Sequence, residues 1–165
     1  MSSGYIEKIK VTVQLALLGE PPAPGSLSLA PYAELHEGPE TLLERLNLPT
    51  RIVPFHRTTD DATLLVNRVA IEWVSAGPEV ESKYVRPHAY QFTREERVRV
   101  RLIGGATFEG VLAMELPQEF NRTSDFLNSD DDFFPLTSPS GTLLVNKRRV
   151  LEVRVYGASC PARAA

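Results

Sequence analysis

The feature that most constrains the fold of this chain is an internal repeat. The segment Leu64-Leu65-Val66-Asn67, followed by Arg68, recurs as Leu143-Leu144-Val145-Asn146, followed by Lys147. Further landmarks recur in the same order: Leu46-Asn47 with Leu127-Asn128, Ile52–Phe55 with Phe133–Leu136, Gly25-x-Leu27-x-Leu29 with Gly110-x-Leu112-x-Met114, Val11-x-Val13-x-Leu15 with Val98-x-Val100-x-Leu102, and Ile71 and Val74 with Val150 and Val153. The spacing between matched residues drifts slowly, as loops of different lengths would cause. We therefore interpret the chain as two diverged copies of one small unit.

Each copy consists of short segments that are typical of β-strands. In the second copy, Arg97–Leu102 alternates charged and apolar residues, which is the period of a strand with one buried face. Gly104-Gly105 then predicts a turn, and Gly110 indicates a sharp bend of the kind that closes small barrels. Helical periodicity is nearly absent, although Thr41–Leu48 fits one or two helical turns. The sequence predicts a mainly all-β fold, made of two tandem small barrels of about five strands each.

The remaining elements follow from the same pattern. Further strands of the second copy are expected at 107–116, 133–136, 143–145 and 150–156, with turns at 138–141 and 146–147, a solvated loop at 130–132 and a short segment of undecided type at 123–128. The first copy repeats this plan with a proline-rich loop at 20–24.

The matched landmarks also set the expected domain boundaries. The first repeat covers residues 1–76, a linker 77–94, the second repeat 95–157, and a tail 158–165. Each repeat is marginal in length for an independent core, so we expect the two repeats to pack on each other. Trp73, Tyr90 and Phe92 are candidates to fill the interface between them. Small barrels also leave open strand edges, which are available for pairing with other chains.

The second copy resembles the Sm-like and SH3-like small barrels in Val98-x-Val100-x-Leu102, in Gly110-x-Leu112 and in its closing strand pair. More specifically, Arg122-x-Ser124-Asp125-Phe126-Leu127-Asn128, Phe134-Pro135-Leu136 and Leu144-Val145-Asn146-Lys147 resemble the pattern of an uncharacterised bacterial family of single small-barrel proteins. The first copy departs from this pattern at Leu42–Arg45. The resemblance implies a fold and no particular chemistry. It also implies that strand edges pair between subunits, so that a fused pair acts as a built-in dimer.

Composition excludes several classes of protein. Of the 165 residues, 42% are hydrophobic and 24% charged, so the chain can bury a core. The formal net charge of −3 provides no global attraction to nucleic acid or anionic lipid. A single cysteine, Cys160, excludes an internal disulfide and favours a reducing compartment. The N-terminus lacks the order of a signal peptide, and Val11–Leu18 is too short to span a bilayer, so we expect a cytoplasmic protein.

The second copy carries a candidate site for anions or nucleic acid. It consists of the basic residues that would converge if its first and last strands pair, namely Arg97, Arg99, Arg101, Lys147, Arg148, Arg149 and Arg154. The alternative interpretation is that they are outward-facing residues, neutralised by acids on neighbouring strands such as Glu109 and Glu152. Aromatic residues for base stacking are not interleaved with them, which weakens the nucleic-acid hypothesis.

A second candidate is a polar pocket formed by Arg122, Ser124, Asp125 and Asn128. The alternative is structural, because Asp and Asn cap turns and satisfy backbone amides. Asn67 and Asn146 have a similar explanation, since Asn tolerates the left-handed conformation of a tight turn. Asp130-Asp131-Asp132 lacks the spacing of a calcium-binding loop.

The inventory for catalysis is thin, and we predict no enzyme, no cofactor and no metal. His36, His56 and His88 are widely spaced, and no nucleophile motif or phosphate-binding glycine loop is present. The first hypothesis is a non-catalytic protein-interaction or assembly module, acting through strand edges on a protein partner or on itself. The alternatives are an Sm-like nucleic-acid-binding protein that uses the arginines, and, with less support, a sensor with a small ligand between the copies.

Overall fold

The computed structural model describes residues 7–87, 94–114 and 122–156. The strands are β1 (Ile9–Leu17), β2 (Ala23–Leu29), β3 (Ile52–Arg57), β4 (Ala62–Asn67), β5 (Ile71–Ala76), β6 (Arg94–Leu102), β7 (Thr107–Met114), β8 (Phe133–Ser138), β9 (Gly141–Asn146) and β10 (Val150–Val155). Two short α-helices, α1 (Leu42–Asn47) and α2 (Thr123–Leu127), and 3₁₀ turns at Arg68–Ala70, Ser82–Tyr84 and Lys147–Arg149 complete the described elements. The prediction of a mainly all-β fold is confirmed.

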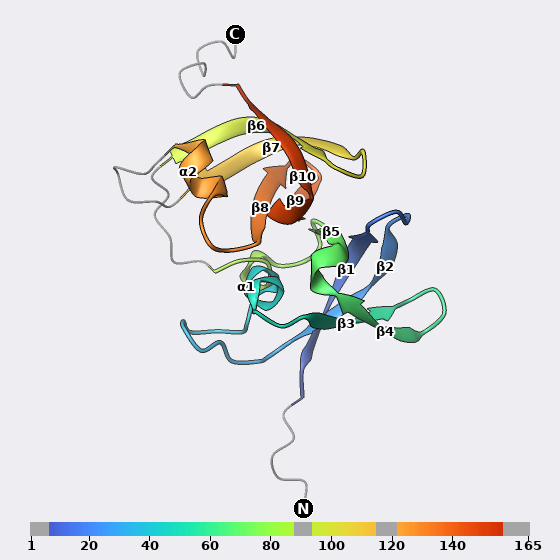
Figure 1. Cartoon of the computed structure of the whole chain (residues 1–165). Coiled ribbons are helices and arrows are strands. Elements are labelled where there is room, and N and C mark those ends of the chain that lie inside the picture. Colours follow the sequence, from blue (N-terminus) through green and yellow to red (C-terminus); the bar gives the residue numbers. More distant parts are fainter. Residues whose placement is uncertain (1–6, 88–93, 115–121, 157–165) are drawn as a thin grey trace, which may run out of the picture.

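All ten strands belong to one antiparallel sheet, in the order β10-β6-β7-β8-β9-β5-β1-β2-β3-β4. The first half of the chain contributes β5-β1-β2-β3-β4, and the second half contributes β10-β6-β7-β8-β9, which is the same order of elements. The halves lie one above the other and meet where β5 pairs with β9 (Figure 1). Over the described residues the sheet is continuous and open, and the expectation of two separate small barrels is not confirmed.

The pairing within each half is also the same. Ile52 lies opposite Asn67 as Phe133 lies opposite Asn146, in the pairs β3–β4 and β8–β9. Leu15 lies opposite Val74 as Val100 lies opposite Val153, in the pairs of first and last strands, and a bulge interrupts both of these pairs near one end. The paired strand residues of one half therefore have structural equivalents in the other.

This register corrects one part of the sequence alignment. Val13 lies opposite Gly25, and Val98 lies opposite Gly110. Val13, Leu15 and Leu17 are therefore the equivalents of Val98, Val100 and Leu102, whereas the sequence comparison matched the triplet that starts two residues earlier. A shift of two residues keeps every side chain on the same face of a strand, so the alternation of apolar residues fits both alignments.

Gly25 and Gly110 lie where each second strand crosses onto the third. A Cβ atom at Gly25 would collide with the carbonyl oxygen of His56, and one at Gly110 would lie 2.5 Å from the carbonyl oxygen of Thr137. Both positions therefore need glycine for the close approach of two backbones, as the bend predicted at Gly110 requires.

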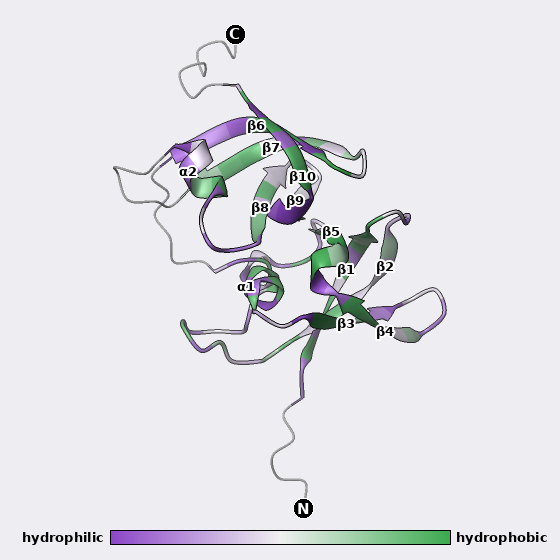
Figure 2. Cartoon of the chain, viewed as in Figure 1, coloured by the Kyte–Doolittle hydropathy of each residue, from purple (hydrophilic) through white to green (hydrophobic). Residues whose placement is uncertain are grey.

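Two apolar clusters form the core, one in each half, and hydrophobic stretches run through the strands of both (Figure 2). The helical turn expected at Thr41–Leu48 is confirmed as α1, whose Thr41 and Glu44 form a capping box. The segment of undecided type is helical and forms α2. In the linker, Val85 is buried in the first cluster and Tyr84 packs against it.

The tight turn predicted from Asn67 and Asn146 is wrong. Their φ angles are −73° and −82°, which is extended backbone, and each asparagine instead caps the 3₁₀ turn that follows it. The proline-rich loop is shorter than predicted, since β2 begins at Ala23 and includes Pro24. Tyr90 and Phe92 lie outside the described residues.

Candidate functional site

The junction between the two halves combines backbone strand pairing, apolar side-chain contacts and polar side-chain contacts. Its backbone pairs β5 with β9, placing Trp73, Val74, Ser75 and Ala76 opposite Val145, Leu144, Leu143 and Thr142. The junction is therefore a strand-to-strand contact, continuous with the sheets on both sides.

Apolar side chains cross the junction in both directions. Phe133 and Leu144 of the second half are 2% and 0% exposed and belong to the core cluster of the first half. Trp73 of the first half packs against the second cluster, where its ring meets that of Phe108 edge-on at 5.5 Å between centroids. Trp73 thus fills the interface, as predicted, and each half completes the core of the other.

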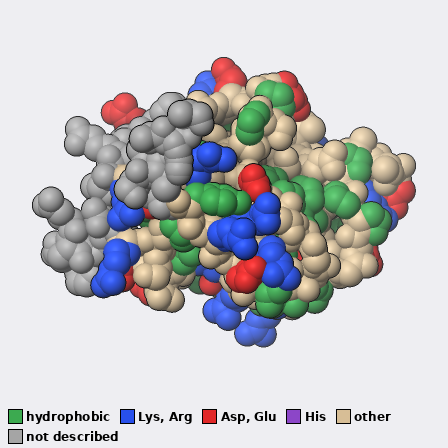
Figure 3. All heavy atoms as spheres, turned by 90° about the horizontal axis from the view of Figure 1, so that it is seen from above, with side chains coloured by type: hydrophobic (Ala, Val, Ile, Leu, Met, Phe, Trp, Pro, Cys, Tyr) green, Lys and Arg blue, Asp and Glu red, His purple; other side chains and the backbone are tan. Residues whose placement is uncertain are grey.

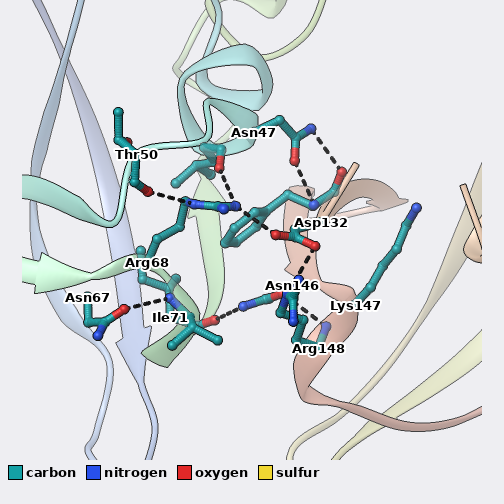
Figure 4. Close-up of polar contacts among 12 residues, drawn as sticks. Asn47, Thr50, Asn67, Arg68, Ile71, Asp132, Asn146, Lys147 and Arg148 are labelled. Atoms are coloured by element: carbon teal, nitrogen blue, oxygen red, sulfur yellow. Dashed lines mark hydrogen bonds and ion pairs between the residues drawn. The ribbon is translucent and has the colours of Figure 1, made fainter. Parts of the chain in front are cut away.

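Asn47, the last residue of α1, clamps the backbone of the other half (Figure 4). Its Nδ2 donates to the carbonyl oxygen of Phe133 at 3.2 Å, and its Oδ1 accepts from the amide of Phe133 at 2.7 Å. One side chain therefore satisfies both backbone groups of the first residue of β8.

Asn146 connects the halves from the opposite side. Its Oδ1 accepts from the amide of Arg148 at 3.0 Å, and its Nδ2 donates to the carbonyl oxygen of Ile71 at 2.9 Å. The side chain is almost fully buried, so both of these bonds are needed to satisfy its polar atoms.

Arg68 and Asp132 form an ion pair across the junction. Arg68 donates to the carbonyl oxygens of Leu46 and Thr50 in its own half, and its Nη1 lies 2.9 Å from Oδ2 of Asp132. Oδ1 of Asp132 accepts from Nε of Arg148 at 3.2 Å. The expectation of a solvated loop is wrong for Asp132, because its carboxylate is only 20% exposed and neutralises two arginines.

The sequence carries a signal for this site in its repeated asparagines. Leu46-Asn47 and Val145-Asn146 are both parts of the repeated landmarks, and Asn47 and Asn146 are the residues that cross the junction. Their partners are backbone groups, which carry no sequence signature. The role of the asparagines is therefore visible only in the structure.

The outer edges of the sheet carry the equivalents of the junction residues. In the described part of the chain, β4 and β10 each pair with one strand only. Leu65 on β4 is the equivalent of Leu144 and is 70% exposed, and Ile52 is the equivalent of Phe133 and is 42% exposed. Leu151 and Val155 on β10 are exposed as well. Ile52, Leu65 and Val155 are thus exposed where their equivalents Phe133, Leu144 and Ala76 are buried, whereas Glu152 on β10 takes the place of Trp73.

The arginines of β6 are engaged by acids on the neighbouring strands. Arg99 donates to Oε2 of Glu109 at 2.9 and 3.0 Å, and Arg101 donates to Oε1 of Glu152 at 2.6 Å. The hydrogen bonds from Arg99 hold the pKa of Glu109 below its ordinary value. Figure 3, which looks down on the molecule of Figure 1, shows Lys and Arg side chains gathered on this side with Asp and Glu side chains among them. The expected neutralisation by Glu109 and Glu152 is therefore present.

The other members of the candidate basic patch have separate surroundings. The guanidinium of Arg97 lies 5.6 Å from the ring centroid of Tyr156, and Arg154 lies opposite Arg99 in the β6–β10 pair. Lys147 donates to the carbonyl oxygens of Phe126 and Ser129, both at 3.3 Å, and burial lowers the pKa of its ammonium. Lys147, Arg148 and Arg149 form the 3₁₀ turn before β10. Nucleic-acid binding by this set stays a prediction.

The candidate polar pocket lies along α2. Arg122 directly precedes the helix, and its Nε lies 3.6 Å from Oδ2 of Asp125. Asn128 follows the last residue of the helix. Arg122, Ser124 and Asn128 are exposed. An open depression of about 480 Å³ lies elsewhere, near Trp73 and Phe108. Ligand binding by the four residues of α2 stays a prediction.

The histidines that the structure describes lie within hydrogen-bond distance of carboxylates. His36 Nε2 lies 2.8 Å from Oε1 of Glu44, and His56 Nε2 lies 2.8 Å from Oδ1 of Asp61. In residues 7–87, 94–114 and 122–156, no three His, Cys, Asp or Glu side chains come together in a way that could hold a metal ion. Among these same residues, no helix is both long and apolar enough to cross a membrane.

Comparisons with known proteins add no assignment. The chain matches no protein-family model, no curated protein and no solved structure.

Proposed function

We propose that this chain is a non-catalytic assembly module whose outer strands, β4 and β10, pair with strands of partner polypeptides. The observation that carries the proposal is the contrast between the internal junction and the outer edges. At the junction, equivalent residues are buried by strand pairing, and at the edges they are exposed. Open edges with apolar residues are the surfaces through which sheets recruit further strands.

The proposal includes the view that the two halves are diverged copies of one SH3-like or Sm-like unit. Three features support it: the common strand order, the common register of each strand pair, and the bulge at the same place in both pairs of first and last strands. The β5–β9 contact is then an association of two such units made permanent by fusion.

Nucleic-acid binding is the weaker alternative. Arg99 and Arg101 would have to break ion pairs with Glu109 and Glu152 before they could bind phosphate. Such surface pairs cost little to break, so the alternative is tested together with the main proposal.

The experiment is affinity capture of the tagged chain from its own cell lysate, with and without nuclease. The native chain is compared with Leu65→Asp, which places a charge on the β4 edge, and with Leu35→Asp, which places the same charge on a loop residue that is also exposed. We expect the native chain and Leu35→Asp to retain protein partners, further copies of the chain included, after nuclease treatment, and Leu65→Asp to lose those that pair with β4. Retention of every partner by Leu65→Asp, or a nuclease-sensitive eluate with high absorbance at 260 nm, would overturn the proposal.

A further inference from the structure

The internal junction provides a template for what the outer edges bind. It joins the last strand of one unit, β5, to the fourth strand of the other, β9. The exposed edges are the last strand of the second half, β10, and the fourth strand of the first half, β4. The chain therefore exposes at its two outer edges the equivalents of the two strands that pair at its internal junction.

From this we propose that the partner of each outer edge is a second copy of this chain, with β10 of one copy pairing antiparallel with β4 of the next. This inference rests on the proposed function, because it names the partner of those edges. The register follows from the β5–β9 pairs: Val153 opposite Leu65, Arg154 opposite Leu64, and Glu152 opposite Val66.

The apolar residues fit this docking. Ile71 and Val74 of β5 are fully buried in the same core cluster as Phe133 and Leu144, whereas their equivalents Val150 and Val153 are only half-buried. Ile52 and Leu65 of a second copy would pack with them as Phe133 and Leu144 pack with Ile71 and Val74. Both partners of the new contact thus expose apolar surface that the contact removes from water.

The polar clamps also have their equivalents at the edges. Asn128 follows α2 as Asn47 ends α1, and it is exposed. It takes the place of Asn47 and binds both backbone groups of Ile52 in the next copy. Asn67 already uses its Oδ1 to accept from Val69, as Asn146 does from Arg148. In the proposed contact, Nδ2 of Asn67 in one copy donates to the carbonyl oxygen of Val150 in the other copy.

Charged residues make the contact between chains weaker than the contact within the chain, because Glu152 takes the place of Trp73 and two cations replace an ion pair. The position of Asp132 is occupied by Arg51, and that of Arg68 by Lys147. The Arg68–Asp132 ion pair is therefore replaced by two cations, which repel each other. We expect the association between chains to be reversible. Because each contact joins β10 of one copy to β4 of the next, copies add head to tail until a ring closes or a filament forms.

The test is sedimentation velocity of the purified full chain over a range of concentrations, with Cys160→Ser as the common background to prevent disulfide cross-links. The native edges should give masses that are multiples of one chain and that increase with concentration. Asn67→Ala and Asn128→Ala should each weaken association roughly tenfold, because each leaves backbone groups at the contact without a partner. Arg51→Asp should strengthen it several-fold by restoring an acid opposite Lys147, and Leu35→Asp should leave it unchanged.

The outcomes separate this inference from the proposed function. A chain that stays monomeric throughout, also as Arg51→Asp, overturns the second copy as partner. If Leu65→Asp nevertheless loses captured proteins, the proposed function stands without this inference. Association that is insensitive to Asn67→Ala, Asn128→Ala and Arg51→Asp uses another surface and also overturns the inference. Because Arg51→Asp is expected to increase association, a variant that merely fails to fold cannot imitate the predicted pattern.

Discussion

Asn67 and Asn146 occupy the same position in the two halves, yet only one of them lies inside the molecule. Both cap a 3₁₀ turn, but Asn146 also donates across the junction to Ile71 and is buried, whereas Asn67 is exposed at the β4 edge. The internal repeat predicts that Asn67 and Asn146 are equivalent. It cannot predict that only Asn146 is buried, because this difference arises from the position of each half in the sheet.

This difference leads to a prediction about stability. Asn146→Ala removes the cap and a buried bond to Ile71, whereas Asn67→Ala removes only the cap. We expect Asn146→Ala to lower the free energy of unfolding by about 1–3 kcal/mol more than Asn67→Ala does, because the carbonyl of Ile71 is left without its donor. Urea denaturation at low protein concentration measures both. Equal losses would show that the bond to Ile71 contributes nothing.

A second residue-scale prediction concerns pH. The hydrogen bond to Glu44 raises the pKa of His36 above its ordinary value of 6.5. Protonated His36 is thus favoured in the folded chain, and its contribution to stability is present below pH 6.5 and lost as pH rises through the raised pKa. The loss of thermal stability on His36→Gln should therefore be larger below pH 6.5 than well above it. An equal loss at both pH values would contradict this assignment.

At the scale of elements, alternation of apolar residues predicts where the strands lie but leaves their register open. The strand at Arg97–Leu102 and the helical turn at Thr41–Leu48 are found as predicted, and β6 begins three residues earlier. The alignment of the first strands is wrong by two residues, a shift that preserves the period. What fixes the register is the close approach at Gly25 and Gly110, a contact between backbones distant in sequence.

The glycines provide the matching prediction. Gly25→Ala and Gly110→Ala each place a Cβ against a carbonyl oxygen of the next strand, so each should destabilise the chain by about 1–3 kcal/mol. Ser28→Ala, at an exposed position of the same strand as Gly25, is the control and should change stability little. Chemical denaturation compares the three variants. If Gly25→Ala and Gly110→Ala lower the free energy of unfolding no more than Ser28→Ala does, the close approach of the two backbones does not require glycine.

At the scale of the whole molecule, the sequence predicts two units that pack on each other, and the structure shows how they do so. The expectation of two separate barrels could not anticipate the continuous sheet, because strand pairing between units involves backbone groups that every residue has. The exchange of Phe133, Leu144 and Trp73 between the two cores gives the contact its apolar part.

Because of this exchange, the halves should hold together without a covalent link. Cleavage at a protease site introduced between Pro87 and Arg94 should leave a complex that elutes at the size of the intact chain in gel filtration. The same cleavage in Leu144→Asp, which places a charge in the first core, should release the fragments. Fragments of the native sequence that separate and stay folded would show that the junction is only a contact between independent units.

A disulfide cross-link in the proposed register tests whether β10 of one chain pairs with β4 of the next. In a Cys160→Ser background, the chain carries Leu65→Cys and Val153→Cys, which the register places opposite each other at a Cα separation of about 4.5–5.5 Å, within the range of a disulfide. The account predicts a ladder of covalent multimers under mild oxidation, abolished by reduction and absent from a Leu35→Cys, Val153→Cys control. No more cross-linking than in that control would contradict it.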